Sequence, residues 1–358
     1  MSSQSEDSTP RRSQPVTIRD VAEAAGVTIG TVSKALNGQG KLRQETRDRI
    51  RATAEELGFR PNILAQGLLR GRTYTVGLLT TDSYGRFSLP LMSGVENVLG
   101  DAQISVFLCD TREDMLRERS YIDSLLTKHV DGIIVTARRT DQRPVLNIGN
   151  TDIPVVYAFT QVPDPTALCI LPDDAQGARL ATEHLLSHGR RHFAQVSGPD
   201  YFESVQLRIE GMREVLQKHE LALPDEHILF GPWRESWGYE AAGSLLKNYP
   251  EVDAVFCGSD QIARGVVDGL RERGARIPDD IAVIGFDNWD VMAEASRPAL
   301  TTIDMNLHEM GRFAGSRLLA MIDGEKESGM IRLPCSLVLR NSCGTHIHPE
   351  NRDERGGR

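Results

Sequence analysis

Residues 16–37 constrain the fold most, because two short amphipathic segments meet there at Gly26. The apolar residues of the first segment recur every three or four positions, which places them on one face of a helix. They are Ile18, Val21, Ala22 and Ala25. Thr17 and Asp20 have the spacing of a capping pair for this helix, and Thr28 can cap a second helix that starts after the glycine.

The second segment turns Val32, Ala35 and Leu36 inward. Two helices joined by a short turn with a glycine form a helix-turn-helix unit, whose second helix can enter the major groove of DNA. An ordinary helical hairpin has the same local pattern. A third helix is expected from Arg43 to Leu57, with Gly58 ending it.

Two stretches closely resemble the lactose-repressor (LacI/GalR) family of bacterial transcription regulators. They are VTIRDVAEAAGVTIGTVSKALNG, from residue 16, and ETRDRIRATAEELGFRPNILAQGLLRGRTYTVGLL, from residue 45. The resemblance continues to about residue 343. It implies a DNA-binding headpiece joined to a core that is similar to sugar-binding proteins.

Charge is distributed unevenly along the chain. Residues 16–72 carry ten basic and six acidic side chains, whereas residues 73–358 carry 29 basic and 42 acidic ones. The whole chain has a net charge of −9, which argues against wrapping nucleic acid around its entire surface. A basic headpiece on an acidic core fits a DNA-binding module with a separate regulatory body.

Several protein classes conflict with the composition. No apolar run approaches the length of a membrane span, and residues 1–15 are polar without an apolar signal region, so we expect a cytoplasmic protein with no membrane partner. The five cysteines are scattered without a CxxC pair, so neither disulfides nor a metal site is expected. The histidines lack paired carboxylate or cysteine motifs. We therefore predict no catalytic residues, no cofactor and no enzyme activity.

The domain organisation that follows has five parts. We expect a disordered tail, a helix-turn-helix domain, a hinge helix with its linker, a ligand-binding and dimerisation core, and a polar tail. Their limits are residues 1–15, 16–60, 61–72, 73–345 and 346–358. The hinge segment Ile63–Leu69 is too short to be a stable helix alone. The resemblance implies that it orders only on DNA, paired with its dimer mate.

Strands and helices alternate from Tyr74 onward, which predicts parallel sheets with helices on both faces. Strand-like runs cover 76–79, 105–108, 132–135, 155–159, 193–197, 254–257 and 282–286. So many strands fit two doubly wound subdomains of the periplasmic-binding-protein type. The resemblance places the N-subdomain at about 73–172 and 301–332, and the C-subdomain at about 173–300 and 333–345. Ligands are expected between the subdomains, beyond the carboxyl ends of the strands.

The start of the second helix is expected to face the DNA bases. Ile29 and Gly30 match the main specificity positions of the family, and Lys34 can donate hydrogen bonds to guanine. Phosphate contacts or capping are expected from Thr17, Thr28, Thr31, Ser33 and Asn37. In the hinge, the resemblance adds Asn62, Ala65 and Leu68, and implies that Leu68 wedges into the minor groove.

Nine residues near predicted strand ends form the candidate ligand site. They are Asp82, Tyr84, Phe87, Phe159, Arg208, Trp237, Ser259, Asp260 and Asp287. The resemblance selects Arg208 and Asp287 as effector contacts and Trp237 as a stacking aromatic. Carboxylate and guanidinium groups can each hold two hydroxyls, and indole stacks on the C–H face of a sugar. The alternative is structural: the aspartates cap helices, and the phenylalanines belong to the core.

The sequence thus predicts a homodimeric repressor on double-stranded palindromic operator DNA. A small effector, expected to be a sugar or glycoside, would control its operator affinity. The alternatives are a regulator that depends on a purine or another co-repressor, and a solute-binding protein. The headpiece and the lack of a signal region disfavour the solute-binding protein.

Overall fold

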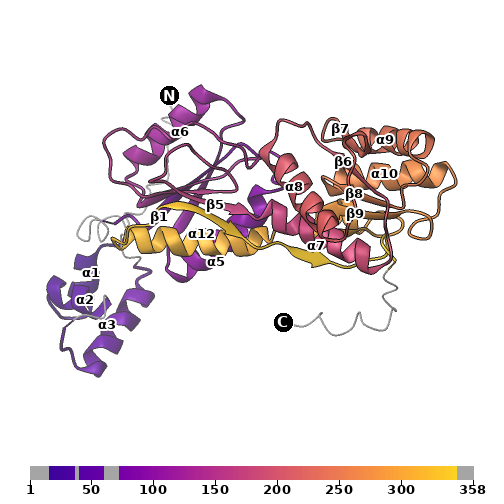
Figure 1. Cartoon of the computed structure of the whole chain (residues 1–358). Helices are drawn as coiled ribbons and strands as arrows, with labels where there is room; N and C mark the ends of the chain where they lie inside the picture. Colours follow the sequence, from indigo (N-terminus) through magenta and orange to yellow (C-terminus); the bar gives the residue numbers. More distant parts are fainter. Residues whose placement is uncertain (1–15, 37–39, 60–71, 345–358) are drawn as a thin grey trace, which may run out of the picture. The chain divides into compact units, whose positions relative to one another are not determined.

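The computed structural model describes residues 16–36, 40–59 and 72–344. The chain divides into two compact units, Met1–Thr73 and Tyr74–Arg358 (Figure 1). The expected tails and the expected hinge helix lie outside the described residues. Over the described ranges, no helix combines the length and the apolar character that crossing a bilayer requires.

The N-terminal unit contains helices α1 (Ile18–Ala24), α2 (Ile29–Leu36) and α3 (Gln44–Glu56). The predicted cap of α1 is confirmed: the Thr17 N–H donates to the Asp20 carboxylate at 2.7 Å, and the Asp20 N–H donates to Thr17 Oγ1 at 3.4 Å. Such a cap contributes about 1 kcal/mol to helix stability. Helix α3 begins after Arg43, whose side chain makes no cap hydrogen bond. The buried residues that join the three helices include Val21, Val32, Ala35 and Ile50.

The first sheet of the C-terminal unit has the strand order β11-β5-β4-β3-β1-β2, and all its pairs are parallel. Its strands are β1 (Thr75–Thr80), β2 (Ser105–Asp110), β3 (Gly132–Val135), β4 (Val155–Ala158), β5 (Leu168–Pro172) and β11 (Gly329–Leu333). Helices α5 (Ser88–Asp101) and α12 (Leu307–Ile322) cover one face, and α6 (Met115–Thr127) covers the other. Because both faces are covered, the central strands are almost entirely apolar.

The second sheet has the order β12-β10-β9-β8-β6-β7. Its strands are β6 (Phe193–Ser197), β7 (Ile228–Phe230), β8 (Ala254–Cys257), β9 (Ala282–Phe286), β10 (Thr301–Asp304) and β12 (Ser336–Val338). Helices α7 (Asp174–Ser187) and α8 (Glu203–Lys218) lie on one face, and α9 (Glu235–Asn248) and α10 (Asp260–Glu272) on the other. The short helices η1 (Asp225–His227) and α11 (Asp290–Ala293) connect strands to these layers.

The two sheets confirm the predicted pair of doubly wound subdomains, with two differences. Strand β12 runs antiparallel to β10, although only parallel strands were expected. The boundary predicted at residue 301 is wrong, because β10 pairs with β9 and β12 of the second sheet. The second crossing between subdomains therefore lies after Asp304, where the chain enters α12. The strand TTID has few apolar side chains, so its burial depends on its neighbours.

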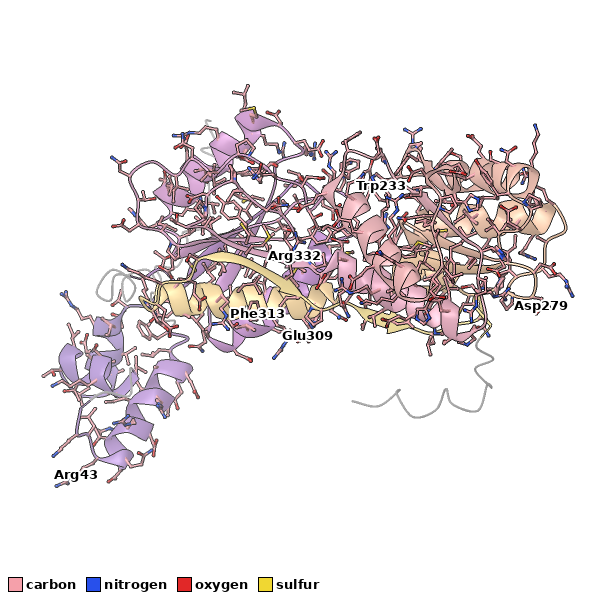
Figure 2. All side chains as sticks on the ribbon, viewed as in Figure 1. Arg43, Trp233, Asp279, Glu309, Phe313 and Arg332 are labelled. Carbon is pink, nitrogen blue, oxygen red and sulfur yellow. The ribbon has the colours of Figure 1, made fainter. Side chains whose placement is uncertain are left out.

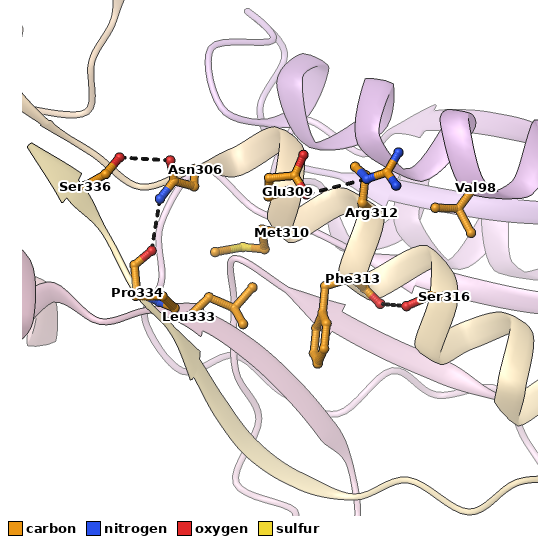
Figure 3. A pocket seen from close by; sticks show the side chains of 10 residues that line it. All are labelled: Val98, Asn306, Glu309, Met310, Arg312, Phe313, Ser316, Leu333, Pro334 and Ser336. Carbon is orange, nitrogen blue, oxygen red and sulfur yellow. Dashed lines mark hydrogen bonds and ion pairs between the residues drawn. The ribbon is translucent and has the colours of Figure 1, made fainter. Parts of the chain in front are cut away.

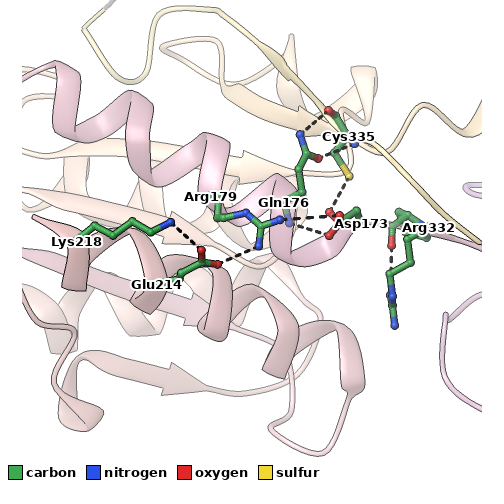
Figure 4. A network of polar contacts seen from close by, with 8 residues as sticks. Asp173, Gln176, Arg179, Glu214, Lys218, Arg332 and Cys335 are labelled. Atoms are coloured by element: carbon green, nitrogen blue, oxygen red, sulfur yellow. Dashed lines mark hydrogen bonds and ion pairs between the residues drawn. The ribbon is translucent and has the colours of Figure 1, made fainter.

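The chain first crosses between the subdomains between β5 and α7, and crosses for the third time between β11 and β12. Hydrogen bonds near the start of α7 join these first and third crossing segments (Figure 4). The Gln176 side chain accepts from the Cys335 N–H at 2.8 Å and donates to the Cys335 carbonyl at 3.3 Å. The Asp173 carboxylate caps α7 by accepting from the Gln176 N–H at 2.9 Å. These contacts hold together two backbone segments that connect the subdomains.

Candidate functional site

Helix α2 exposes the residues predicted to face DNA bases. Ile29 is 44% exposed, and Gly30 and Lys34 are also exposed, while Val32 and Ala35 anchor the opposite face. The first turn of α2 is therefore available for contact with a partner.

The threonines around α2 have structural partners. The Thr28 and Thr31 hydroxyl oxygens lie 2.9 Å apart, and Thr28 Oγ1 accepts from the Thr31 N–H at 3.3 Å. Thr17 belongs to the α1 capping box. The capping alternative is thus present for these residues, and Ser33 is half-buried on α2. Asn37, Asn62, Ala65 and Leu68 lie outside the described residues.

In the core, Asp82 follows β1 and caps α5. Its carboxylate accepts hydrogen bonds from the backbone N–H groups of Phe87 at 2.7 Å and Ser88 at 3.0 Å, and the residue is 3% exposed. Helix capping, the structural alternative for Asp82, is therefore present and uses one oxygen of its carboxylate, and a ligand contact by Asp82 stays a prediction. Phe87 stacks on Phe159 with ring centres 4.9 Å apart, whereas Tyr84 is 90% exposed.

Asp287 follows β9 in the second sheet and forms an ion pair with Arg86, which lies in the loop after β1 in the first sheet. The pair therefore spans the two subdomains at the carboxyl ends of their strands. Burial raises the pKa of Asp287, and the Arg86 guanidinium opposes that shift. Arg86 also lies over the aromatic rings of Phe87 and Trp289, at 4.8 and 4.4 Å from the ring centres.

Arg208 on α8 is enclosed by the protein and only 5% exposed. It donates from Nε to Asp174 at 2.8 Å and from Nη1 to the Gly258 carbonyl at 2.6 Å. Its guanidinium carbon lies 3.5 Å from the ring centre of Phe286. Arg208 thus joins α7, α8 and the ends of β8 and β9, a structural role that the sequence did not indicate.

Ser259 and Asp260 both hold local backbone. Ser259 Oγ accepts from the Ile262 N–H at 3.2 Å and caps α10. The Asp260 carboxyl accepts from the Trp289 N–H at 2.7 Å and contacts Thr302 Oγ1 at 2.5 Å. Burial and the nearby Asp287 carboxylate raise the pKa of Asp260 to about 8. Asp260 is therefore an anchor for the turn after β9, whereas the structural alternative expected it to cap the helix that follows.

Two tryptophans lie near the end of β6. The Trp237 indole N–H donates to the Ser197 carbonyl at 3.0 Å, and its ring fills the space beside Gly231. Trp233, labelled in Figure 2, packs across Gly198 and Gly258, where a Cβ would lie 2.1 and 3.2 Å from its ring. Both glycines make room for this indole at the ends of β6 and β8.

A second set of polar contacts joins the subdomains at Glu203, the first residue of α8. Its carboxylate accepts hydrogen bonds from Gln161 and, at 3.1 Å, from Arg332 on β11. Its backbone N–H donates to the Asp141 carboxylate at 3.2 Å. The N-terminus of α8 is thus capped by a side chain of the other subdomain.

Sequence reasoning missed Arg86, Glu203, Trp233 and Trp289. Arg86 and Trp289 stand within two positions of the predicted residues Phe87 and Asp287, so the loops were found but not these side chains. No local sequence pattern indicated Glu203, because its hydrogen-bond partners come from distant segments of the chain.

A pocket of about 590 Å³ opens beside α12 (Figure 3). Met310 and Phe313 of α12 line it together with Leu333, the last residue of β11, and Pro334, which follows it. None of the nine predicted ligand residues lines this pocket. It is therefore distinct from the residues at the strand ends.

The comparisons with known proteins identify the family. A model of bacterial regulatory proteins of the lacI family matches residues 17–62, and a periplasmic binding protein-like domain matches residues 182–343. The ribose operon repressor of Halalkalibacterium halodurans is 31% identical over 336 residues, which cover 94% of this chain and 99% of that protein. The chain belongs to the lacI family of bacterial regulatory proteins.

Other lacI-family members match over a similar length. The transcriptional repressor PurR of Vibrio campbellii is 31% identical, with 91% of this chain and 98% of that protein covered. The Lac repressor dimer bound to operator and the anti-inducer ONPF superposes with a TM-score of 0.75 at 27% identity, covering 92% and 99% of the two chains. The complex of the regulator CelR with cellobiose gives 0.64 at 28%, covering 91% and 99%.

These matches confirm the predicted family, fold and general function. As a lacI-family member, the chain is a DNA-binding transcriptional regulator that joins a helix-turn-helix domain to a ligand-binding α/β core.

Proposed function

We propose that this lacI-family protein is a repressor whose operator affinity falls when a sugar or glycoside binds between its core subdomains. The main support for this ligand site is the Arg86–Asp287 ion pair, which joins loops of both subdomains beside the rings of Phe87 and Trp289. Carboxylates that accept from hydroxyls and aromatic rings that stack on C–H faces are suited to sugars. The CelR complex with cellobiose supports this ligand class.

The headpiece is proposed to read DNA through the exposed start of α2. Ile29 would contact an apolar group such as a thymine methyl, Gly30 would permit close approach, and Lys34 would donate to guanine. Thr17, Thr28, Thr31, Ser33 and Asn37 would position the headpiece on phosphates. Asn62, Ala65 and Leu68 would act in the minor groove, with Leu68 as the wedge.

A homodimer on a palindromic operator is proposed for the active form. Strand β2 is an edge of the first sheet and exposes Phe107 and Leu108 at 41% and 45%. Met115 and Leu116, at the start of α6, are each 84% exposed. Exposed apolar residues on an edge strand fit burial against a second copy, and the Lac repressor is seen as a dimer on its operator.

We propose that the headpiece covers residues 16–60, the hinge 61–72 and the core 73–345, and that tails cover 1–15 and 346–358. Residues 301–304 belong to the C-subdomain. The protein is proposed to act in the cytoplasm, where its operator DNA is, without a cofactor and without catalysing a reaction.

Operator selection followed by ligand screening tests this function. A random DNA pool is enriched on the full chain, and the selected operator is then titrated with and without sugars, glycosides and purines. Release of operator by a sugar or glycoside is expected. Tighter binding with a purine would instead favour the co-repressor alternative. Failure to enrich any palindromic sequence would contradict the repressor proposal.

A further inference from the structure

Arg86 places a guanidinium group where the loops of the two subdomains meet. Its side chain is 15% exposed, and that of its partner Asp287 is 8% exposed. The rings of Phe87 and Trp289 both lie within 4.8 Å of the guanidinium carbon. A carboxylate and two aromatic rings thus surround a group supplied by the protein itself.

Arg86 and the buried Arg208 differ in the number of guanidinium nitrogens that contact their partners. Arg208 uses Nε, Nη1 and Nη2 on Asp174 and Gly258. Arg86 pairs with Asp287 through Nη2, and its buried Nε has no acceptor among the described residues. A guanidinium bound through one nitrogen on a loop is held by fewer contacts than a forked pair, so it is easier to replace.

We propose that Arg86 is an internal occupant of the effector site, which an effector must displace from Asp287 and the two rings. The identity of the site as an effector site rests on the function proposed above. Because only molecules with Arg86 displaced can bind at Asp287, the apparent affinity is lowered by the fraction in that state. Arg86 therefore raises the effector concentration that is required to fill the site.

The other contacts between the subdomains do not depend on Arg86. Glu203 retains Gln161, Arg332 and Asp141 when the Arg86 side chain is shortened. Removing the guanidinium therefore leaves a hole beside Asp287 while a second set of contacts still joins the subdomains. That hole has the size and charge to accept a free guanidinium ion.

Chemical rescue tests this occupancy on the full chain. Methylguanidinium chloride is titrated in the millimolar range into Arg86→Ala, and tryptophan fluorescence and the midpoint of thermal unfolding are followed. Saturable binding is expected for Arg86→Ala, because the ion returns a cation to Asp287 and Trp289. The wild type, whose site is filled, is expected to bind at least about tenfold more weakly.

Three further variants locate the effect. Arg86→Ala combined with Asp287→Asn is expected to lose the saturable response, and Arg86→Ala combined with Trp289→Phe is expected to lose its fluorescence component. Arg119→Ala removes an exposed arginine paired with Asp123 four residues away, and it is expected to behave as the wild type. Sodium chloride at equal ionic strength corrects for screening.

Equal responses of the wild type and Arg86→Ala would overturn the proposal, as would a response that survives Asp287→Asn. If Arg86→Ala does not fold, Arg86→Ser leaves a similar hole and is measured in the same way. Loss of folding in both variants would show that Arg86 is required for the core and would also overturn it. Neither operator nor effector is used, so failure here is distinguishable from failure of the proposed repressor function.

Discussion

Gly311 of α12 lies so close to Leu91 of α5 that a Cβ on the glycine would be 1.9 Å from the Leu91 carbonyl oxygen. Gly94 of α5 makes the reciprocal approach, with its added Cβ 1.9 Å from the His308 carbonyl oxygen. Helices α9 and α10 repeat this arrangement through Gly238 and Gly265, at 2.1 and 1.9 Å from backbone oxygens. On both sheets, therefore, a pair of helices packs with the two backbones in direct contact.

Gly311→Ala is expected to destabilise the core, because backbone atoms rather than a flexible side chain oppose the new methyl group. Overpacking of this kind costs about 1–3 kcal/mol in the free energy of unfolding. Gly315, one turn later in α12, is the matched control, since its added Cβ would lie 3.4 Å from the nearest atoms. Gly315→Ala is expected to be neutral or to stabilise the helix by up to about 1 kcal/mol. Urea unfolding checks both, and equal midpoints for the two variants would contradict this account.

Asp260→Asn is expected to make stability less dependent on pH. The carboxyl has a pKa near 3.8 when unfolded and about 8 when folded, so between these values the folded state holds the extra proton. The contribution of the Asp260 carboxyl to the stability of the folded state is therefore complete below the unfolded pKa. It is lost as the pH rises through the folded pKa. The free energy of unfolding should fall by up to about 1.4 kcal/mol per pH unit in this window.

Asparagine can still accept from the Trp289 N–H and donate to Thr302 Oγ1, so the variant keeps both contacts without a titrating group. Urea midpoints of the wild type and Asp260→Asn, measured from about pH 5 to about pH 9, are expected to converge or cross at alkaline pH. The exposed Asp290→Asn is the control and should follow the wild type. Parallel curves for Asp260→Asn and the wild type would show that Asp260 is ionised throughout.

Lys34→Ala is expected to relax the preference for one base pair in each half-site, at about 1–3 kcal/mol per contact. Lys34 is exposed on α2, whereas Lys41, which is also exposed, lies between α2 and α3. Lys41→Ala removes the same charge and should leave the base preference unchanged, even if it lowers affinity for all sequences. Selection from random DNA with each variant measures the difference. An unchanged preference after Lys34→Ala would refute base contact by Lys34.

Asp287→Ala is expected to abolish the response to effector and to leave operator binding in its absence near the wild-type level. The carboxylate is the group at the strand ends that is proposed to accept the effector's hydroxyls, and it lies outside the N-terminal unit. Operator titrations with the effector found by screening measure the response, with Asp290→Ala as the matched control. Release of operator at the wild-type effector concentration would place the ligand elsewhere.

Much of the architecture was predictable because buried parallel strands are nearly continuous apolar runs. The strands at 132–135, 193–197, 254–257 and 282–286 have the predicted limits. Strand β10 did not reveal its sheet, because Thr301 and Thr302 are polar and are buried by pairing with β9 and β12. Its neighbours, rather than its own side chains, determine its position.

The sequence by itself determined the helix-turn-helix unit and its caps, since Thr17 and Asp20 interact across a single helical turn. It also located the loops at the strand ends. Only the tertiary structure decided what the polar groups in those loops do: Asp82 and Asp260 are used in capping and anchoring, and Arg86 meets Asp287 across 201 residues. Local contacts repeat with the period of a helix or strand, whereas contacts between distant loops depend on how two sheets are brought together.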